Sequence, residues 1–358
     1  MARDYSIAVI PGDGIGPEVV REAVRVLERI AAIEGFRVRL TKYPFGAQHY
    51  LATQEIFPDK AFSEVRGHDA ILLGAIGDPR IEVGLLEFGI IAKMRFELDL
   101  DVNLRPVRLF AEHLCPLKDT RPEQVDFVVV RENTEDAYAG MRGFFKKGTP
   151  DEIATQEIIF TRKGVERAVR YAFELARSRT RKKLTLIDKA NAVRAMDLWT
   201  RTFAEVGAEY PDVAREHNYI DAACMYVVRN PEGFDTVVTS NMFGDIFTDL
   251  AAMIQGGLGV AASGNIHPGQ VSLFEPIHGS APKYTGKNVA NPIATVMAVQ
   301  MMLDYLGEKS AARRLEDVVA GLLASKRLPS LGTDSGFSTT QIGDLVIGAL
   351  EGAGASRS

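Results

Sequence analysis

The chain has 358 residues, of which 46% are hydrophobic and 25% charged, and its formal net charge at pH 7 is −5. This composition is ordinary for a soluble globular protein and excludes disorder as the main state, and the negative balance argues against broad nucleic-acid binding. The length favours two domains that share a sheet, or one large α/β unit, with a sizeable buried core.

The cysteines and the start of the chain bear on the cellular compartment. Cys115 and Cys224 are too few for a disulfide framework and lie in no CxxC or Cys/His pairing, which indicates a reduced setting. The first residues lead directly into a strand without a signal peptide, and there is no apolar run of about 18 residues. We therefore expect a soluble cytoplasmic protein that contacts no membrane.

The chain opens with a predicted strand over 6–10, a tight turn over 11–16 (PGDGIG) and a helix that starts at Pro17. A Rossmann dinucleotide-binding turn would need the pattern GxGxxG and an acidic residue after the second strand. Here the glycines read GxGxG, and the strand near 36–40 is followed by Thr and Lys at 41–42. The sequence therefore predicts a fold other than the classical Rossmann fold.

Strands and helices then alternate. A buried strand over 70–75 is followed by a helix over 85–98, and strands return at 102–109 and 125–131. A glycine-rich, basic and aromatic excursion near 140–160 is typical of a dimer arm. The later predicted elements are helices over 162–177, 196–206, 293–306 and 311–325 and strands over 184–187 and 234–239. This alternation predicts an α/β architecture with mostly parallel strands.

Two carboxylates directly after the strand over 234–239 form the first chemical feature. Asp245 and Asp249 are four residues apart in a predicted helix, which places their side chains roughly 5–6 Å apart on one face. Asp245 could answer the helix dipole, and Asp249 could be a solvated surface acid. The next segment, 250–262, is however apolar and glycine-rich, and a divalent cation such as Mg²⁺ or Mn²⁺ would remove the repulsion between the two charges.

Three arginines lie near the ends of predicted elements: Arg95 in a helix, and Arg105 and Arg131 in strands. A surface ion pair would explain any one of them, but three converging guanidinium groups would bind a small polyanion, and carboxylates suit their forked geometry. Tyr138 and Lys189 are candidate proton carriers, although each alone is more often structural.

Six motifs, taken together and in order, resemble a known family over essentially the full length. They are PGDGIG (11–16), NLRP (103–106), RENTE (131–135), DKAN (188–191), NMFGDIFTD (241–249) and EPIHGSAP (275–282). The family that they resemble is that of the isocitrate/isopropylmalate dehydrogenases, the β-decarboxylating dehydrogenases of 3-isopropylmalate, isocitrate, homoisocitrate, tartrate and D-malate.

The resemblance implies an isopropylmalate-dehydrogenase-like fold of two domains and an assembly into homodimers or tetramers. The first, coenzyme-binding domain would join 1–101 to 255–358. The second, 102–254, would carry the dimer interface and the arm near 140–160. The active site would lie between the domains.

The resemblance also implies residue roles. Lys189 would help to remove the substrate's hydroxyl proton and Tyr138 would protonate the enolate, with Lys189 and Asp221 reaching the site from the neighbouring subunit. The positions that would bind the malate carboxylates are Arg95, Arg105 and Arg131, and those that would hold Mg²⁺ or Mn²⁺ are Asp221, Asp245 and Asp249. The positions matched to the coenzyme are Gly74, Glu87, Glu275, His278, Gly279, Ser280, Ala281, Lys283, Tyr284 and Asn291.

One departure from the family pattern bears on the coenzyme. NAD-using members carry an Asp after His-Gly-Ser-Ala-Pro that accepts from the ribose hydroxyls, whereas Lys283 and Tyr284 stand here. This pair resembles the NADP-dependent isocitrate dehydrogenases, in which a cation meets the 2′-phosphate, so NADP is favoured over NAD. The alternative is a surface lysine in an enzyme that still takes NAD.

A second departure bears on the substrate's side chain. Isocitrate enzymes carry Ser and Asn six and four residues before the arginine that matches Arg95, whereas Gly89 and Ile91 stand here, beside Ile90. We expect Ile90, Ile91 and Val193 to form an apolar wall. Ala192 stands where many isopropylmalate enzymes carry valine, which predicts a larger pocket.

The leading interpretation is metal-dependent oxidative decarboxylation of a 3-alkyl-substituted malate, 3-isopropylmalate to 2-oxoisocaproate in leucine biosynthesis, with NADP or NAD. The alternatives are a tartrate or D-malate dehydrogenase and then a homoisocitrate or isocitrate dehydrogenase. A non-catalytic regulatory subunit of this fold usually loses metal or base residues, and this chain keeps Asp221, Asp245, Asp249, Tyr138 and Lys189.

Overall fold

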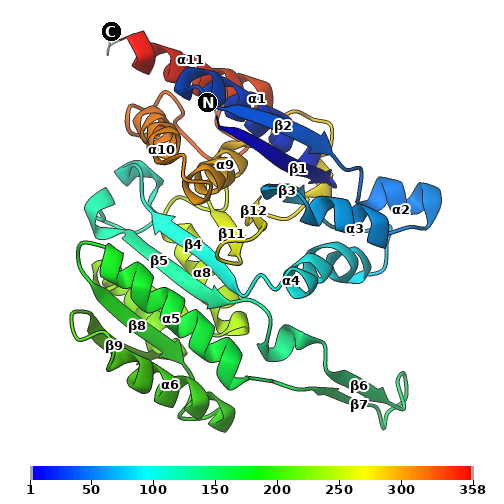
Figure 1. Ribbon diagram of the computed structural model, residues 1–358, viewed down its shortest axis with the longest axis vertical. Coiled ribbons are helices and arrows are strands. Elements are labelled where there is room, and N and C mark those ends of the chain that lie inside the picture. Colours follow the sequence, from blue (N-terminus) through cyan, green and yellow to red (C-terminus); the bar gives the residue numbers. More distant parts are fainter. Residues whose placement is uncertain (1–2, 356–358) are drawn as a thin grey trace. The chain divides into compact units, whose positions relative to one another are not determined.

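The computed structural model describes residues 3–355 (Figure 1). The chain forms two compact units: unit 1 comprises Met1–Leu100, Arg108–Pro122 and Ala252–Ser358, and unit 2 comprises Asp101–Val107 and Glu123–Ala251. Residues 1–2 and 356–358, which the predicted first domain includes, lie outside the described part of the chain.

The strands of unit 1 lie side by side in one sheet. In spatial order they are β2 (Arg37–Lys42), β1 (Asp4–Gly12), β3 (Ala70–Ala75), β12 (Ser272–Pro276) and β11 (Ala262–Ile266). β1 is parallel to β2 and β3, and β12 is parallel to β3 but antiparallel to β11. All six residues of β3 are buried, as expected for a parallel strand with both faces covered.

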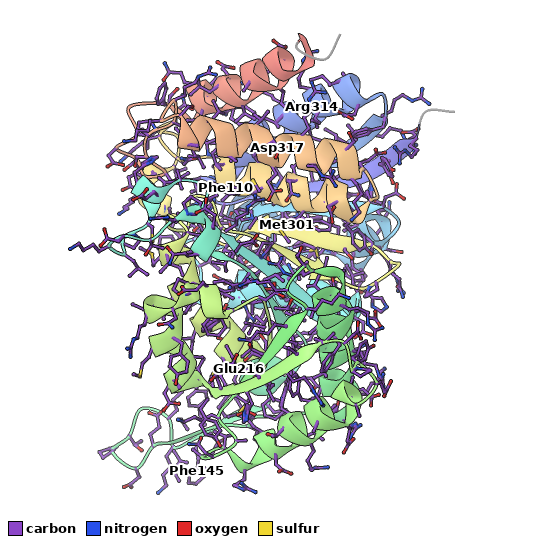
Figure 2. The ribbon with its side chains drawn as sticks, turned by 90° about the vertical axis from the view of Figure 1, so that its left-hand side faces the viewer. Phe110, Phe145, Glu216, Met301, Arg314 and Asp317 are labelled. Atoms are coloured by element: carbon purple, nitrogen blue, oxygen red, sulfur yellow. The ribbon has the colours of Figure 1, made fainter. Side chains whose placement is uncertain are left out.

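Helices cover both faces of this sheet because successive strand side chains point to opposite sides. On one face, α1 (Gly16–Glu34) and α9 (Ile293–Tyr305) lie against the strands, and α10 (Lys309–Ala324) and α11 (Thr339–Ala355) pack on those helices. Figure 2 labels Met301 on α9 and Arg314 and Asp317 on α10. The other face packs on an apolar cluster from α3 (Asp59–Arg66), a π-helix (Glu87–Ala92) and α4 (Lys93–Glu97), with α2 (Ala47–Thr53) at its edge.

The strands of unit 2, in spatial order, are β4 (Val102–Arg108), β5 (Asp126–Glu132), β10 (Thr236–Thr239), β8 (Lys183–Asp188) and β9 (Ala214–Tyr219). The pairs β5–β10, β10–β8 and β8–β9 are parallel. The helices of this unit are α5 (Arg162–Ser178), α6 (Asp197–Gly207), α7 (Ile220–Arg229) and α8 (Asn241–Ile254). The short 3₁₀ turns of the chain are Glu112–Leu114, Pro122–Gln124, Asp136–Ala139, Arg194–Met196, Pro231–Gly233 and Pro282–Tyr284.

A two-stranded antiparallel ribbon, β6 (Arg142–Phe145) with β7 (Ile153–Gln156), projects from unit 2 (Figure 1). Phe144, Phe145 and Ile153 are exposed on this arm to 58%, 61% and 55%. Figure 2 shows Phe145 at the far end of unit 2.

The predicted fold class is confirmed: the protein is α/β, its large sheet is mostly parallel, and the topology is not that of a classical Rossmann fold. One local prediction differs from the structure, because the helix predicted over 85–98 contains the π-helical segment. Residues 108–122 cluster with unit 1, where Arg108 pairs with Glu316 at 2.7 Å. Within 3–355, no helix is both long and apolar enough to span a membrane.

Candidate active site

Parallel strands place the candidate residues of unit 2 near one another. β5, β8 and β10 end at Glu132, Asp188 and Thr239, and in a parallel sheet these carboxyl ends share one edge. The residues that follow them are the segment containing Tyr138, the DKAN motif and α8. The order of the strands thus brings Tyr138 close to Asp245, although more than a hundred residues separate them in the sequence.

The centre of this edge is a carboxylate shared by two arginines. Arg105 is 5% exposed and Arg131 1%, and they donate to Oδ1 of Asp245 at 3.1 and 2.5 Å. The hydroxyl of Tyr138 donates to the other oxygen, Oδ2, at 3.1 Å. Buried guanidinium groups need anions, and Asp245 supplies one. The structure thus brings together four residues that the sequence singled out.

Neutral oxygens hold the two arginines in place. Nε and Nη2 of Arg131 donate to Oδ1 of Asn241 at 3.0 and 2.7 Å. Nε of Arg105 donates to Oδ1 of Asn103 and its Nη1 to Oγ1 of Thr248, both at 2.6 Å. Asn103, Asn241 and Thr248 were not singled out from the sequence, although all three lie inside the motifs that carry the family resemblance.

Tyr138 is positioned by a strained aspartate that the sequence did not indicate. Asp136 has φ +72° and is buried, and its Oδ2 accepts from the N–H of Met242 in the first turn of α8 at 2.9 Å. The following turn carries Tyr138 over Asp245. Burial and the negative charge of Asp245 raise the pKa of Tyr138, so that this side chain stays protonated and able to donate.

Glu132 lies beneath this turn and is 1% exposed. Its carboxylate accepts from the N–H and Oγ1 of Thr134 at 2.6 and 2.8 Å and from the N–H of Glu135 at 2.9 Å. Burial nevertheless raises the pKa of Glu132 to about 7 from an ordinary 4.5, because these hydrogen bonds do not offset the lost hydration of the charge.

Asp245 and Asp249 form the acidic pair of α8. Oδ1 of each lies near Arg105, at 3.1 and 3.6 Å. Partial burial and the negative charge of Asp245 raise the pKa of Asp249, which is the electrostatic conflict that a divalent cation would relieve. Carboxylate oxygens are the donors that Mg²⁺ and Mn²⁺ prefer, so the pair fits such an ion.

Asp221 does not join this pair within the chain. It lies in the first turn of α7 and contacts Nζ of Lys189 at 2.7 Å, and this hydrogen bond lowers the pKa of Asp221. Among residues 3–355, no three His, Cys, Asp or Glu side chains are grouped closely enough to hold a metal ion. Within one chain the acidic pair of α8 and the Lys189–Asp221 pair are therefore two separate groups.

Arg95 belongs to unit 1, where Nη2 donates to Oε1 of Glu275 at 3.2 Å. The same oxygen accepts from Nδ2 of Asn265 at 2.8 Å. Nε of Arg95 is buried and has no hydrogen-bond partner in the described part of the chain. An unpartnered buried guanidinium N–H is costly, and it fits a position that receives an anionic ligand.

Unit 1 also contains a pocket of about 290 Å³ whose lining includes Glu87, Gly279 and Ser280. Beside these residues, Nε2 of His278 and Nδ2 of Asn291 are buried without a partner among the described residues. Burial lowers the pKa of His278, which keeps the imidazole neutral. Polar atoms left unsatisfied at positions matched to coenzyme contacts fit a polar ligand such as a dinucleotide.

The remaining coenzyme candidates have different surroundings. Gly74 lies inside β3, where a Cβ would come within 2.2 Å of the carbonyl oxygen of Pro11, so its place is explained by packing. Ala281 adopts a left-handed backbone with φ +42° and turns the chain toward Lys283. Nζ of Lys283 lies 4.8 Å from the ring centroid of Tyr284, and both belong to an exposed 3₁₀ turn.

Ile90 and Ile91, two residues of the predicted apolar wall, lie in the π-helix and differ in burial. Ile90 has an exposed fraction of 0% and packs in the core of unit 1, whereas Ile91 is half-buried at the edge of that core. Ala192 and Val193 lie in unit 2, in the turn that Lys189 closes by accepting from their N–H groups at 2.9 and 2.8 Å. Ile91 is therefore better placed than Ile90 to meet a ligand.

Comparison with known proteins places the chain among dehydrogenases. A family model described as isocitrate/isopropylmalate dehydrogenase matches residues 6–346. A 3-isopropylmalate dehydrogenase of Thermobifida fusca is 51% identical over 346 residues, which cover 96% of this chain and 97% of the relative. A 3-isopropylmalate dehydrogenase of Nocardia farcinica is 49% identical over 347 residues, covering 96% and 99%.

Solved structures of similar architecture carry other names. An isocitrate dehydrogenase from Methylococcus capsulatus has a TM-score of 0.87 and 37% identity, covering 97% of this chain and 99% of that one. A β-decarboxylating dehydrogenase from Thermococcus kodakarensis has a TM-score of 0.79 and 33% identity, covering 97% and 96%.

The raised pKa of Glu132 predicts a pH-dependent stability. The stabilisation from a carboxyl whose folded-state pKa exceeds its unfolded-state value is fully present below pH 4.5 and is lost as the pH rises through about 7. Relative to the unmodified protein, Glu132→Gln should gain about 3 kcal/mol of unfolding free energy between pH 4.5 and pH 8. Urea unfolding across this pH range measures the difference, and Glu64→Gln, at an exposed site, is the control. If the unfolding free energies of Glu132→Gln and the unmodified protein change with pH in parallel, the prediction is wrong.

Proposed function

The chain belongs to the isocitrate/isopropylmalate dehydrogenase family, and from that premise we propose that it oxidises and decarboxylates a 3-alkyl-substituted malate, 3-isopropylmalate, to 2-oxoisocaproate. As a member it is an oxidoreductase of the NAD(P)- and divalent-metal-dependent kind. The observation that carries the proposal is the cluster of two buried arginines, Asp245 and Tyr138. The names of the similar curated proteins support the choice of substrate.

Substrate binding rests on the guanidinium groups. Arg105 and Arg131 are held by Asn103, Thr248 and Asn241, so their donors are oriented before a ligand arrives. Preorganised, poorly hydrated donors bind a carboxylate with little loss of side-chain entropy. Arg95, with its unpartnered Nε, is proposed as the third cation for the malate core.

Asp245 and Asp249 would hold a divalent cation together with Asp221 of the partner subunit. Such a cation would supply Lewis-acid polarisation of a substrate oxygen, and NAD(P) would supply the hydride acceptor. The chain's own contribution is to hold the metal-binding carboxylate in one position. Asp245 is fixed by both arginines and Tyr138, and Asp249 is its neighbour on α8.

Two groups would move protons. Lys189 would accept the substrate's hydroxyl proton as a neutral amine, which it can become once Asp221 binds the cation and no longer stabilises the ammonium charge. Because Lys189 and Asp221 lie side by side, one subunit would supply both the base and a metal ligand. Tyr138 would return a proton to the enolate carbon after loss of the carboxylate. Its raised pKa suits a donor that must hold its proton at neutral pH.

A homodimer is supported by apolar surface in unit 2. Met225 and Val228 on α7 are 67% and 42% exposed, and Ile246 on α8 is 55% exposed. The arm adds Phe144 and Phe145. Apolar side chains on two helices and a projecting ribbon are typical of an interface between copies of a chain.

NADP is the proposed preferred coenzyme. Lys283 is a cation on an exposed turn that follows the HGSAP segment, and its ammonium lies 4.8 Å from the centre of the Tyr284 ring. This arrangement supplies charge and a flat surface for a 2′-phosphorylated ribose. The interaction would be charge-assisted, and NAD lacks the phosphate needed to form it.

Isocitrate is the second candidate substrate, because an isocitrate dehydrogenase is among the similar solved structures and the Lys-Tyr pair is of that type. Against it, Gly89 and Ile91 offer no hydrogen-bond donor for a third carboxylate. Leaving a carboxylate unpaired against apolar atoms would cost much of the binding energy.

The substrate proposal predicts a rising series of kcat/KM from malate through 3-methylmalate to 3-isopropylmalate. Each buried methylene contributes about 0.8 kcal/mol, or roughly fourfold per carbon. Ile91→Ser should flatten the series, whereas Leu51→Ser, at an exposed site on α2, should leave it unchanged. Spectrophotometric turnover with these acids, isocitrate and tartrate measures it; isocitrate or tartrate as the best substrate refutes the proposal.

The acid role predicts that Tyr138→Phe stalls after hydride transfer. Processing of the supplied oxo-acid intermediate should fall by roughly a hundredfold or more, since a positioned general acid contributes that much. Tyr50→Phe, a matched change in unit 1, should process it at the unmodified rate. Unimpaired processing by Tyr138→Phe would show that another group donates the proton.

The coenzyme proposal predicts that Lys283→Asp combined with Tyr284→Ile shifts the NADP/NAD ratio of kcat/KM toward NAD. A charge-assisted contact contributes about 1.5–3 kcal/mol, so the shift should be roughly tenfold to a hundredfold. Lys60→Asp on α3 controls for net charge. An unmodified protein that uses NAD far better than NADP rules the idea out.

The dimer proposal predicts that Met225→Glu with Val228→Glu yields monomers in sedimentation velocity. Burying two carboxylates in an apolar interface is unfavourable, and turnover should fall with the dimer because the partner's Lys189 and Asp221 would no longer reach the site. Leu51→Glu, an equally drastic change on unit 1, should leave the dimer intact. An unmodified protein that is active as a monomer would be incompatible with this assembly.

A further inference from the structure

The PGDGIG turn over 11–16 has no assigned role, since it is not a phosphate-binding turn. The first amides of α1 are already bonded: that of Gly16 to the carbonyl oxygen of Asp13 at 2.8 Å, and the next two available N–H groups to that of Ile15 at 3.0 and 3.1 Å. Pro17 has no N–H to offer. The start of α1 therefore keeps no donor for a phosphate.

The turn instead presents a carboxylate to the protein's own backbone. Asp13 is 5% exposed; its Oδ1 accepts from the N–H of Ala47 at 2.6 Å, and its Oδ2 from the N–H of Gly77 at 3.0 Å. Its own N–H donates to the carbonyl oxygen of Ala75 at 2.7 Å. One buried side chain thus joins the start of α2 to the loop that follows β3.

The neighbouring glycines allow this close approach. A Cβ on Gly46 would lie 2.6 Å from Oδ1 of Asp13, and a Cβ on Gly14 would lie 1.9 Å from the carbonyl oxygen of Ser280. That carbonyl accepts from the N–H of Ile15 at 2.8 Å. The turn over 11–16 therefore contacts the segment 279–282 as closely as it contacts the start of α2 and the loop after β3.

The loop after β3 and the segment 279–282 both line the pocket in unit 1 and are called here its two walls. Its lining comes from residues 76–87 and from 279–282, and the turn bonds to Gly77 in the first wall and to Ser280 in the second. We propose that Asp13 is a positioning residue that sets the separation of these walls for the coenzyme, without touching the coenzyme itself. The inference rests on the proposed function, because it takes NADP or NAD as the pocket's ligand.

The test compares Asp13→Asn with Asp69→Asn by titrating the folded proteins with NADPH and NADH and following coenzyme fluorescence. Asn keeps one acceptor but turns an amide donor toward the N–H of Gly77 or Ala47. The coenzyme Kd should rise about tenfold, as for loss of one charge-assisted hydrogen bond, while kcat at saturating coenzyme changes little. Asp69 also bonds β1, through the N–H and Oγ of Ser6 at 2.7 and 2.8 Å, and its variant should bind normally.

A second variant and a second measurement guard against a folding defect. Gly46→Ala keeps Asp13 but displaces its carboxylate, and should weaken coenzyme binding in the same direction. Hydrogen exchange without ligand should be faster in Asp13→Asn at the amides of Ala47 and Gly77 and in the loop over 76–86, but not at 279–282.

The outcomes are distinct. Unchanged coenzyme Kd in folded Asp13→Asn or Gly46→Ala, or unchanged exchange at Gly77, overturns the inference and leaves the proposed function in place. A kcat loss in Asp13→Asn with no change in Kd also overturns it. An unmodified protein that binds neither NADPH nor NADH overturns the proposed function and this inference together.

Discussion

Two almost fully buried guanidinium groups share one carboxylate, and much of unit 2 is arranged to make that contact possible. A buried charge without a partner costs several kcal/mol, so Arg105 and Arg131 could not be retained at the sheet edge without Asp245. Asp245 in turn must stand at the start of a helix that directly follows a buried strand, because only there does its side chain meet both arginines.

The need to bond the buried arginines explains why polar residues lie among the apolar residues of unit 2. Asn103, Asn241 and Thr248 each accept a hydrogen bond from an N–H of Arg105 or Arg131, and these bonds orient the two guanidinium groups. A fully satisfied polar network is rigid, and rigidity is what a carboxylate-binding site requires. In the same network Oδ1 of Asp249 lies 3.6 Å from Nη1 of Arg105, a long ion-pair distance, so the carboxylate of Asp249 stays suitable for binding a cation.

How far the sequence could predict this arrangement depends on the range of each interaction. Asp245 and Asp249 were predictable because their spacing is local, and the arginines because buried strands rarely end in a charge without a reason. Asp136 was not, since nothing in its neighbours indicates φ +72°. The sequence predicted an apolar wall that includes both Ile90 and Ile91, but it could not distinguish their burial. The π-helix over Glu87–Ala92, whose number of residues per turn differs from that of an α-helix, buries Ile90 in the core and leaves Ile91 half-buried.

In the segment from Glu132 to Tyr138, two residues reduce the stability of the fold and hold the backbone that positions Tyr138. Glu132 carries a buried carboxyl whose pKa is about 7, and Asp136 holds a backbone conformation that an L-residue adopts at a cost. Neither feature strengthens the core. Asp136 fixes the turn on the N-terminus of α8, and Glu132 holds Thr134 and Glu135, which lead into the turn. Tyr138, which is 39% exposed, is thereby held with its hydroxyl on Asp245. The proton-donor role proposed for Tyr138 needs that restriction, because general acid catalysis depends on geometry before it depends on pKa.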